Sequence, residues 1–333
     1  MVFVTGGTGF LGAYILKELV EKGYQVRAIR RTEGVPSFIP ASVGLAVEWI
    51  PGNILDTVGL TEVMEGSHAV IHAAAKVSLL SRERTSMFKT NIEGTMNVVN
   101  TAVALGIPHF LHVSSVAALG RSDRERSIDE GHPWDTVELH SNYAKSKYHA
   151  EMEVWRAIAE GLPAAIINPS TILGYGDWNK GSCAIFKSVY EEFPWYTEGI
   201  NGFVNVEDVA RAAVMLMERK ISGERFVVSA DNWSFRQLFN SIADGFNKKH
   251  PGRMATPLLS EIAWRMEKMK AAFSGSTPLL TRESAKIARS RTHFSNQKIQ
   301  RFLPGYGFTP LEQTIREACN NYLSLALRPE LAK

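Results

Sequence analysis

Short apolar runs alternate with longer stretches of helical periodicity over the first half of the chain. Six runs are apolar enough to predict buried strands: Val2–Thr5, Gln25–Ile29, Ala46–Ile50, Ala69–Ala73, Phe110–Val113 and Ala164–Ile167. Between several of them, apolar positions recur every three or four residues, as in Leu11, Ile15 and Leu19, which predicts amphipathic helices. Strands that alternate with helices form βαβ units, so we predict an α/β fold with a Rossmann-type, doubly wound parallel sheet.

The pattern changes after residue 169. Residues 170–202 are rich in Gly, Trp, Tyr and Phe and show little periodicity, which is typical of a loop-rich region that binds substrate. Phe203–Val206 and the helical run Val209–Met217 are expected to return to the sheet domain, and helical patterns dominate from about Trp233 onward. We therefore expect a dinucleotide-binding domain at 1–169 and about 203–230. A smaller, mostly helical substrate-binding region is expected at about 170–202 and 231–333.

A glycine-rich loop, Thr5-Gly6-Gly7-Thr8-Gly9-Phe10-Leu11-Gly12, follows the first predicted strand and opens the first predicted helix. Glycines in this pattern permit a tight turn, let the backbone approach a pyrophosphate, and bring the helix close to the strand. The phosphates would meet free amide groups and the positive end of the helix. An ordinary glycine turn is the alternative, but the strand before and the helix after favour a dinucleotide site.

The end of the second strand is where such a site distinguishes the two nicotinamide dinucleotides. An enzyme that uses NAD usually has an acidic residue there, whereas this chain has Arg30 and Arg31. Guanidinium groups match a 2′-phosphate in charge and geometry, so we predict NADP(H) in preference to NAD(H). If both arginines are simply solvated, NAD(H) remains possible.

One tyrosine has the spacing of a catalytic acid. Tyr143 is the only one of nine tyrosines with a lysine, Lys147, four residues later. Residues i and i+4 share a helix face, so the ammonium is expected to lower the tyrosine pKa from its usual value of about 10. Ser114 and Ser115 end the fifth strand, where a hydroxyl can bind a substrate oxygen or cap the next segment.

Composition and charge argue against several other classes. The 37 basic and 34 acidic residues are too balanced for a nucleic-acid-binding surface. No apolar run approaches the about 20 residues of a membrane span, and no secretory signal precedes the first motif, so we expect a cytoplasmic protein. Cys183 and Cys319 are expected to be buried. No metal site is expected, because the histidine pairs His68/His72 and His109/His112 straddle strand starts.

Along the chain, several motifs occur in this order: Thr5-Gly6-x-x-Gly9-x-x-Gly12, His72-Ala73-Ala74-Ala75, Asn91, Ser114-Ser115, Tyr143-x-x-x-Lys147 and Asn168-Pro169. In combination, these motifs resemble those of the extended (atypical) short-chain dehydrogenases/reductases of the NAD-dependent epimerase/dehydratase superfamily. The resemblance covers residues 1 to about 230 well and the C-terminal third only loosely. The segment from Val113 to Gly120 lacks the acid pair of sugar-nucleotide dehydratases and the tyrosine common in epimerases, so the chain is more similar to the dihydroflavonol reductase-like and 3β-hydroxysteroid dehydrogenase-like branches.

The resemblance implies a role for each matching residue. Ser115 is expected to be the catalytic hydroxyl, Tyr143 the general acid/base, and Lys147 the ligand of the nicotinamide ribose. Asn53 replaces the usual aspartate of a segment that contacts adenine, which removes a charge but keeps an acceptor. Residues expected to bind the cofactor are Gly6, Thr8, Gly9, Phe10, Leu11, Gly12, Arg30, Arg31, Asn53, Ile54, His72, Ala73, Ala74, Ala75, Asn91, Tyr143, Lys147, Asn168 and Pro169.

Some of these residues have a second interpretation. Asn91 is expected to hold its helix under the site, or to cap that helix. Lys76 could be a solvated loop residue. Substrate contacts are expected from Lys76, Ser78, Ser170, Trp178, Phe186, Trp195 and Tyr196. The aromatic residues of this set, together with Tyr175 and Phe193, could instead pack a core rather than line a pocket.

The function predicted from these features is a NADP(H)-dependent reductase or dehydrogenase that interconverts a ketone or aldehyde and its alcohol. The partner is then a small carbonyl or alcohol substrate, and the resemblance implies a homodimer through helices around Ile92–Val103 and Tyr143–Trp155. One alternative is a nucleotide-sugar epimerase with resident NAD. The diphosphate of its sugar-nucleotide substrate could be bound by Arg211, Arg225, Arg236 or Arg253. Another is a non-catalytic NADP-binding sensor, although such proteins tend to lose the catalytic tyrosine. The charge run at 121–130 is expected to be a solvated loop rather than a clamp for a charged substrate.

Overall fold

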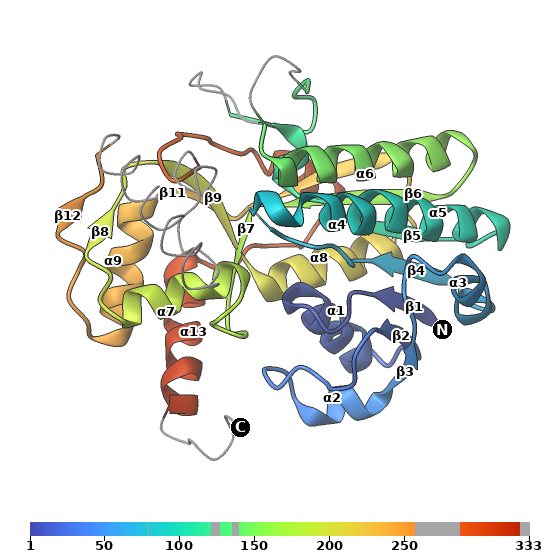
Figure 1. Cartoon of the computed structure of the whole chain (residues 1–333), viewed down its shortest axis with the longest axis horizontal. Helices are drawn as coiled ribbons and strands as arrows, with labels where there is room; N and C mark the ends of the chain where they lie inside the picture. Colours follow the sequence, from blue (N-terminus) through green and yellow to red (C-terminus); the bar gives the residue numbers. More distant parts are fainter. Residues whose placement is uncertain (79, 121–126, 135–139, 257–286, 327–333) are drawn as a thin grey trace.

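The computed structural model describes residues 1–78, 80–120, 127–134, 140–256 and 287–326. Seven strands form a parallel central sheet in the order β10-β6-β5-β4-β1-β2-β3 (Figure 1). The order reverses between β1 and β4, which is the arrangement of a Rossmann fold and confirms the predicted fold class. The strands are β1 (Val2–Thr5), β2 (Val26–Arg30), β3 (Val47–Pro51), β4 (Ala69–His72), β5 (Phe110–Val113), β6 (Ala164–Pro169) and β10 (Glu224–Val228).

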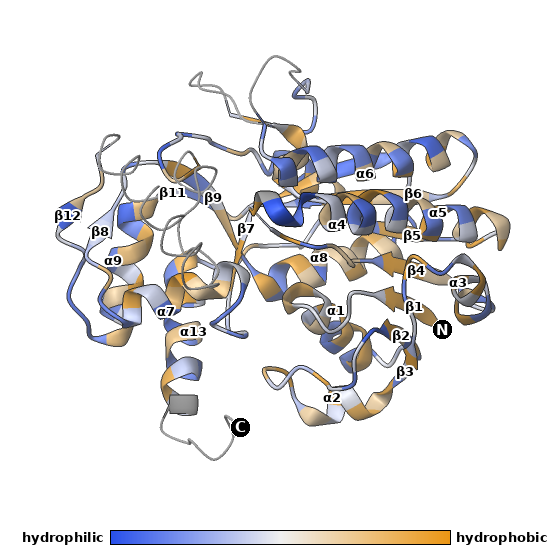
Figure 2. Ribbon diagram, in the orientation of Figure 1, coloured by the Kyte–Doolittle hydropathy of each residue, from blue (hydrophilic) through white to orange (hydrophobic). Residues whose placement is uncertain are grey.

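Helices cover both faces of this sheet because alternate residues of each strand point to opposite sides. In β1, Val2 and Val4 belong to one hydrophobic core cluster and Phe3 to another. The first cluster contains residues of α1 (Phe10–Glu21), α2 (Ala41–Ala46) and α8 (Val206–Glu218). The second contains residues of α3 (Thr57–Met64), α5 (Gly94–Ala104) and α6 (Asn142–Ala159). Figure 2 shows the central strands among the most hydrophobic segments.

All six predicted strands are present, with ends that shift by one or two residues. The predicted return of Phe203–Val206 to the sheet domain is wrong for the strand. Here β9 (Ile200–Asn205) pairs with β7 (Thr171–Leu173) and β11 (Asp231–Ser234) in a separate three-stranded sheet. Helix α8 contains the predicted helical run Val209–Met217; it follows β9 directly and packs against α1, and the chain then adds β10 at the sheet edge beside β6.

The C-terminal elements form a smaller hydrophobic core beside the three-stranded sheet. Its residues come mainly from α7 (Ala184–Tyr190), α9 (Phe235–Phe246) and α13 (Leu311–Ala326). A two-stranded sheet joins β8 (Trp195–Tyr196) to β12 (Arg253–Met254), and α12 (Gln297–Phe302) packs near β10. In the described part of the chain, every helix is too short or too polar to cross a lipid bilayer. The exact division into two domains remains a prediction.

Candidate active site

The glycine loop between β1 and α1 is packed too tightly for side chains. Gly6 has φ +74°, and a Cβ there would lie 2.6 Å from the Ala73 carbonyl carbon; a Cβ on Gly12 would lie 2.0 Å from the Gly6 oxygen. Helix α1 begins after Gly9 without a side-chain cap and without an acidic residue in its first turn. Its first amides, on Phe10, Leu11 and Gly12, are therefore available to an anion, and Thr8 and Gly9 beside them are exposed. This geometry fits a pyrophosphate.

The two predicted arginines follow the end of β2 but differ in their surroundings. The Arg30 guanidinium lies 5.4 Å from the centre of the Trp49 ring and donates to the Gly34 carbonyl at 3.3 Å. Arg31 is exposed. Arg30 is therefore held in place by neighbouring groups, and Arg31 is open to solvent.

Asn53 and Ile54 lie just beyond the end of β3. The Asn53 side-chain oxygen accepts a hydrogen bond from the Leu55 amide at 3.1 Å, while the rest of this exposed residue faces solvent. Ile54 is buried in the core cluster that includes α5, and its carbonyl accepts from Asn97 at 3.1 Å. The acceptor that Asn53 retains is thus already used within its own turn.

His72, at the end of β4, is buried between two threonines. Its Nδ1 lies 2.7 Å from the Thr5 hydroxyl and its Nε2 lies 3.0 Å from the Thr95 hydroxyl. Because Thr95 donates to the Asn91 carbonyl at 2.6 Å, it accepts from Nε2 of a neutral imidazole. Burial, with a smaller effect of the Lys147 charge, lowers the pKa of His72 to about 3. The imidazole is therefore turned into the protein, while Ala73 and Ala74 are half-buried and Ala75 is exposed beyond the strand end.

Asn91 connects the segment after β4 with α6. It lies in a π-helical turn, Lys89–Glu93, that follows α4 (Arg84–Phe88) and leads into α5. Its side chain accepts from the Lys76 amide at 2.7 Å and donates to the Lys76 carbonyl at 3.0 Å and the Ser146 hydroxyl at 2.9 Å. Asn91 is within a helical turn rather than at a helix start, so the capping interpretation is wrong and the packing interpretation describes its contacts.

The two nearby residues predicted to touch substrate have intramolecular partners. The Lys76 ammonium lies 2.9 Å from the Ser86 hydroxyl and 3.4 Å from the Glu83 carboxylate. The Ser78 hydroxyl is buried and accepts from the Leu80 amide at 3.1 Å. Both contacts hold the segment after β4 against the residues that follow it.

Ser115, Tyr143 and Lys147 meet at the end of β5. The Ser115 side chain lies close enough to the Tyr143 phenol to act against the rise of its pKa, and the Lys147 ammonium donates to the Val113 carbonyl at 2.8 Å. Ser115 also caps the short 3-10 helix η3 (Val116–Leu119) by accepting from the Ala117 amide at 3.2 Å, so both of its predicted roles are compatible. The structure thus brings together three residues that the sequence places 28 and 32 positions apart along the chain.

Burial controls the titration of this group. It lowers the pKa of Lys147 to about 8 despite the opposing effect of Glu151, and Lys147 is 2% exposed. Burial also raises the pKa of Tyr143, while the hydrogen bond with Ser115 lowers it. The net direction for Tyr143 is opposite to the lowered pKa predicted from the Tyr-x-x-x-Lys spacing. The reason is that the Lys147 ammonium lies on the Val113 carbonyl and burial dominates around the phenol.

Asn168, Pro169 and Ser170 continue the site at the end of β6. Asn168 is fully buried and its amide donates to the Ser115 carbonyl at 3.0 Å. Ser170 is also buried, and its hydroxyl has no hydrogen-bond partner among the described residues. A buried hydroxyl without a partner is costly, so Ser170 Oγ is available to a ligand or a water molecule at this strand end.

The aromatic residues predicted to line a pocket are largely packing residues. Phe186 is fully buried in the C-terminal core, and Trp178 stacks on Tyr322 with ring centres 5.4 Å apart. Trp195 and Tyr196 form β8 and lie beneath arginine side chains. The alternative of core packing therefore describes Trp178 and Phe186, and we do not assign them to substrate.

The remaining sequence predictions concern titratable residues. Cys183 and Cys319 are buried and free, as expected. Within the described residues, no three His, Cys, Asp or Glu side chains are grouped so that they could hold a metal ion. Of the charge run, residues 121–126 lie outside the described residues; of the rest, Ile128 is fully buried and the predicted solvated loop is wrong there.

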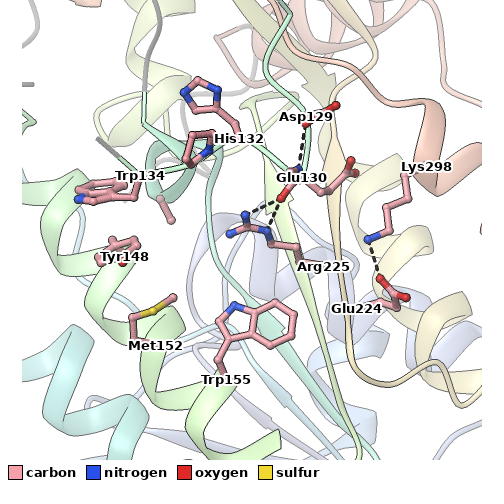
Figure 3. A pocket seen from close by; sticks show the side chains of 13 residues that line it. Asp129, Glu130, His132, Trp134, Tyr148, Met152, Trp155, Glu224, Arg225 and Lys298 are labelled. Atoms are coloured by element: carbon pink, nitrogen blue, oxygen red, sulfur yellow. Dashed lines mark hydrogen bonds and ion pairs between the residues drawn. The ribbon is translucent and has the colours of Figure 1, made fainter. Parts of the chain in front are cut away.

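A cavity of about 610 Å³ lies on the other side of α6 (Figure 3). Tyr148, Met152 and Trp155 of α6 form one side, and Arg225 of β10 lies at its base beside the Glu130 carbonyl, to which it donates. The sequence pattern did not indicate this cavity, because its walls come from segments far apart in the chain. Glu151, which accepts from both Arg225 and Ser114, was not predicted either. The spacing of Glu151 from Tyr143 and Lys147, eight and four residues, is the signal that could have found it.

The sequence and structure of this chain are similar to those of several known proteins. A model of the NAD dependent epimerase/dehydratase family matches residues 2–229. A protein of Synechocystis sp. named as a candidate dihydroflavonol 4-reductase is 29% identical over 95% of this chain and 92% of its own length. Sterol demethylase protein B of Methylococcus capsulatus is 28% identical over 90% of this chain and 92% of its own. The crystal structure of gox2253 superimposes with a TM-score of 0.81 at 29% identity, covering 97% of this chain and 98% of that one.

Proposed function

Because the chain belongs to the NAD dependent epimerase/dehydratase family, we propose that it is a NADP(H)-dependent reductase or dehydrogenase that interconverts a ketone or aldehyde and its alcohol. The observation that carries this proposal is that Ser115, Tyr143 and the buried Lys147 come together at the carboxyl end of β5, where the Ser115 side chain acts on the Tyr143 phenol and Lys147 donates to the Val113 carbonyl. The names of the relatives, a candidate dihydroflavonol reductase and a sterol-processing protein, support a carbonyl or alcohol on a ring-bearing substrate.

The residues around the glycine loop suit a dinucleotide. The free amides at the start of α1 would hold the pyrophosphate, and Lys147 would hold the nicotinamide ribose. Arg31, with Arg30 packed beside it on Trp49, would bind a 2′-phosphate, which supports NADP(H) in preference to NAD(H). When bound, the nicotinamide supplies the hydride chemistry.

Ser115 and Tyr143 would act on the substrate oxygen. In the direction of reduction, both hydroxyls donate hydrogen bonds to the carbonyl oxygen and polarise the bond. Tyr143 then gives its phenolic proton to that oxygen while the carbonyl carbon accepts hydride, which yields the alcohol and a tyrosinate. In the direction of oxidation, the tyrosinate takes the proton back. Lys147 carries a positive charge at neutral pH, since its pKa is about 8, and this charge stabilises the tyrosinate.

The contacts of four arginines distinguish the reductase from the alternative function of a nucleotide-sugar epimerase. An epimerase needs free cations for a diphosphate, but Arg211 is bonded to Asp208, and Arg225 to Glu151. Arg236 pairs with Glu198, and Arg253 lies over the Trp195 ring. These contacts favour the reductase. A non-catalytic sensor has no need of the bonded Ser115–Tyr143 pair. A cytoplasmic location remains a prediction.

The test follows NADPH absorbance with a panel of aldehydes, ring-bearing ketones, and UDP- and dTDP-sugars. We expect oxidation of NADPH by at least one carbonyl compound and a loss of about 100-fold or more in Tyr143→Phe, because the proton donor is removed. Tyr148→Phe is the matched control. It changes a tyrosine of the same helix that stacks on Trp134, away from Ser115, and should keep full activity.

The other outcomes decide between the remaining functions. Isomerisation of a sugar nucleotide without net oxidation of the cofactor would replace the reductase with the epimerase. Tight binding of NADPH with no turnover of any compound would support the sensor. Equal activity of Tyr143→Phe and Tyr148→Phe would reject Tyr143 as the proton donor.

A further inference from the structure

Helix α6 presents three polar side chains to the end of β5 at intervals of four residues. Tyr143 interacts with the Ser115 side chain, Lys147 donates to the Val113 carbonyl at 2.8 Å, and Glu151 accepts from the Ser114 hydroxyl at 2.7 Å. Each of three consecutive residues, 113 to 115, is thus held by one residue of the same helix face. Tyr143 and Lys147 have proposed roles in the chemistry, whereas Glu151 has none so far.

The inner carboxylate oxygen of Glu151 holds two strand ends together. Its Oε2 accepts from Ser114 at the end of β5 and from the Asn168 amide of β6 at 2.9 Å. The same amide nitrogen of Asn168 donates to the Ser115 carbonyl at 3.0 Å. Glu151 therefore restrains Ser115 from both sides, through the side chain of Ser114 and through Asn168.

The second oxygen of Glu151 is held by two residues that line the cavity beside α6. Its Oε1 accepts from the Arg225 guanidinium at 3.0 Å and from the Trp155 indole at 3.3 Å. Both of these residues line the cavity, where Figure 3 shows the Arg225 side chain beside Trp155. Four donors thus satisfy a carboxylate that is 1% exposed, so its position is determined by bonds to three different strands and its own helix.

Glu151 stands four residues from Lys147 on the same helix and supplies a negative charge near it. The charge raises the pKa of Lys147 against the dominant effect of burial. The other titratable groups around Lys147 are Tyr143 on its own helix and two histidines, His72 and His112, on β4 and β5. Burial lowers the pKa of both histidines, so they stay neutral near pH 7 and add no positive charge beside Lys147.

We infer that Glu151 is a positioning residue for the proposed carbonyl reduction, which orients Ser115 and keeps Lys147 charged. The inference rests on the proposed function for its effect on turnover, but its effect on Lys147 does not require a known substrate. Glu151 itself does not touch the reacting atoms.

The test compares Glu151→Gln with the wild-type full-length protein in two measurements. The first is the pH dependence of NADPH affinity, followed by fluorescence from pH 6 to 10. Removal of the carboxylate charge lowers the pKa of Lys147 below about 8, so Lys147 loses its proton at lower pH. We expect the alkaline loss of NADPH affinity to move to lower pH by roughly one unit.

The second measurement is turnover of an active carbonyl substrate. Displacement of Ser115 is expected to lower kcat by about 10- to 100-fold, with a small change in KM, because the hydroxyl acts mainly in the transition state. The alkaline limb of kcat/KM should move in the same direction as the binding curve.

Two further variants separate positioning from a general loss of structure. Glu153→Gln removes a carboxylate from the outer side of α6, where Glu153 pairs with Arg156, and should match the wild type in both measurements. Ser114→Ala removes one hydrogen bond of Glu151 but keeps the charge, so kcat should fall while the pH dependence stays in place. This variant also tests the inference if Glu151→Gln does not fold.

The outcomes are distinct. A wild-type pH dependence in Glu151→Gln, even with reduced stability, overturns the inference, because a purely structural role does not move the Lys147 titration. Unchanged kcat in both Glu151→Gln and Ser114→Ala overturns it as well. If the wild-type protein binds NADPH but reduces no carbonyl, the proposed function fails, and a shifted binding curve in Glu151→Gln still supports the role of Glu151 toward Lys147.

Discussion

Lys147 is a cation in an almost fully enclosed position, and its neighbours explain how it stays charged. Burial lowers its pKa to about 8, and the carboxylate of Glu151 opposes that effect. The Val113 carbonyl satisfies one of its three N–H donors. A pKa close to neutrality suits a residue that must support proton transfer without holding its proton too firmly.

Arg31 allows a direct test of cofactor preference at the scale of one residue. Arg31→Ala removes an exposed guanidinium that would bind the 2′-phosphate, so NADPH affinity should fall about tenfold, or about 1.4 kcal/mol, while NADH affinity stays the same. Titration with both cofactors measures the change. Arg27→Ala is the control, because Arg27 lies on β2, the strand that Arg31 follows, but pairs with Glu48. Equal affinity for both cofactors in the wild type, or no loss in Arg31→Ala, contradicts the preference for NADP(H).

At the scale of elements, the contact between α1 and the glycine loop shapes the proposed cofactor site. The Gly12 Cα lies so close to the Gly6 carbonyl that the helix can begin beside the strand only without a side chain. The helix N-terminus is thereby aimed at the place where the phosphates would bind.

Gly12→Ala tests that contact. The new methyl group would lie 2.0 Å from the Gly6 oxygen, which is backbone and cannot rotate away, so we expect a loss of about 1–3 kcal/mol in the free energy of unfolding. NADPH affinity should fall at least about tenfold, since the first amides of α1 are displaced. Gly7→Ala is the matched control, because its Cβ would meet side-chain atoms rather than backbone: Leu16 at 2.8 Å and Trp49 at 3.4 Å. Urea unfolding and NADPH titration of both variants measure the difference; an equal effect of the two substitutions would refute the explanation.

At the scale of the whole molecule, the C-terminal elements are joined to the substrate side of the sheet. β6 leads directly into β7, and α13 reaches back through Tyr322, whose hydroxyl accepts from the Gly176 amide at 3.0 Å. Buried aromatic rings from α7, α9 and α13 complete this region. A substrate site at the carboxyl ends of β5 and β6 would therefore lie beside the well-packed core that α7, α9 and α13 form.

The proposed homodimer is also a property of the whole molecule. Helices α5 and α6 pack side by side on one face of the sheet, and we propose that two copies associate through this pair of helices. Light scattering at micromolar concentration should then give a mass about twice the 36.9 kDa of one chain. A single species near 36.9 kDa would exclude the dimer.

The sequence by itself determined the elements whose signals are local. The six apolar runs, the glycine loop and the Tyr143–Lys147 pair depend on spacings within one strand, turn or helix, and such periodicity is visible along the chain. The carboxylate of Glu151, on the same helix face, was predictable in principle from the same spacing.

Only the tertiary structure decided which distant groups meet. The partners of Glu151 lie 37, 17 and 74 residues away, on β5, β6 and β10, and the order of strands in the sheet brings them to one point. Burial in the folded chain likewise places Phe186 in the core and raises the pKa of Tyr143. Strand pairing places β9 in the three-stranded sheet instead of the central sheet. The physical reason is that pairing across strands and the loss of solvent depend on the packing of the whole chain, which no local pattern records. This is why Ser115, Tyr143 and Lys147 could be proposed from the sequence, while the partners of Glu151 on β5, β6 and β10, Arg225 among them, could not be recognised before the fold was known.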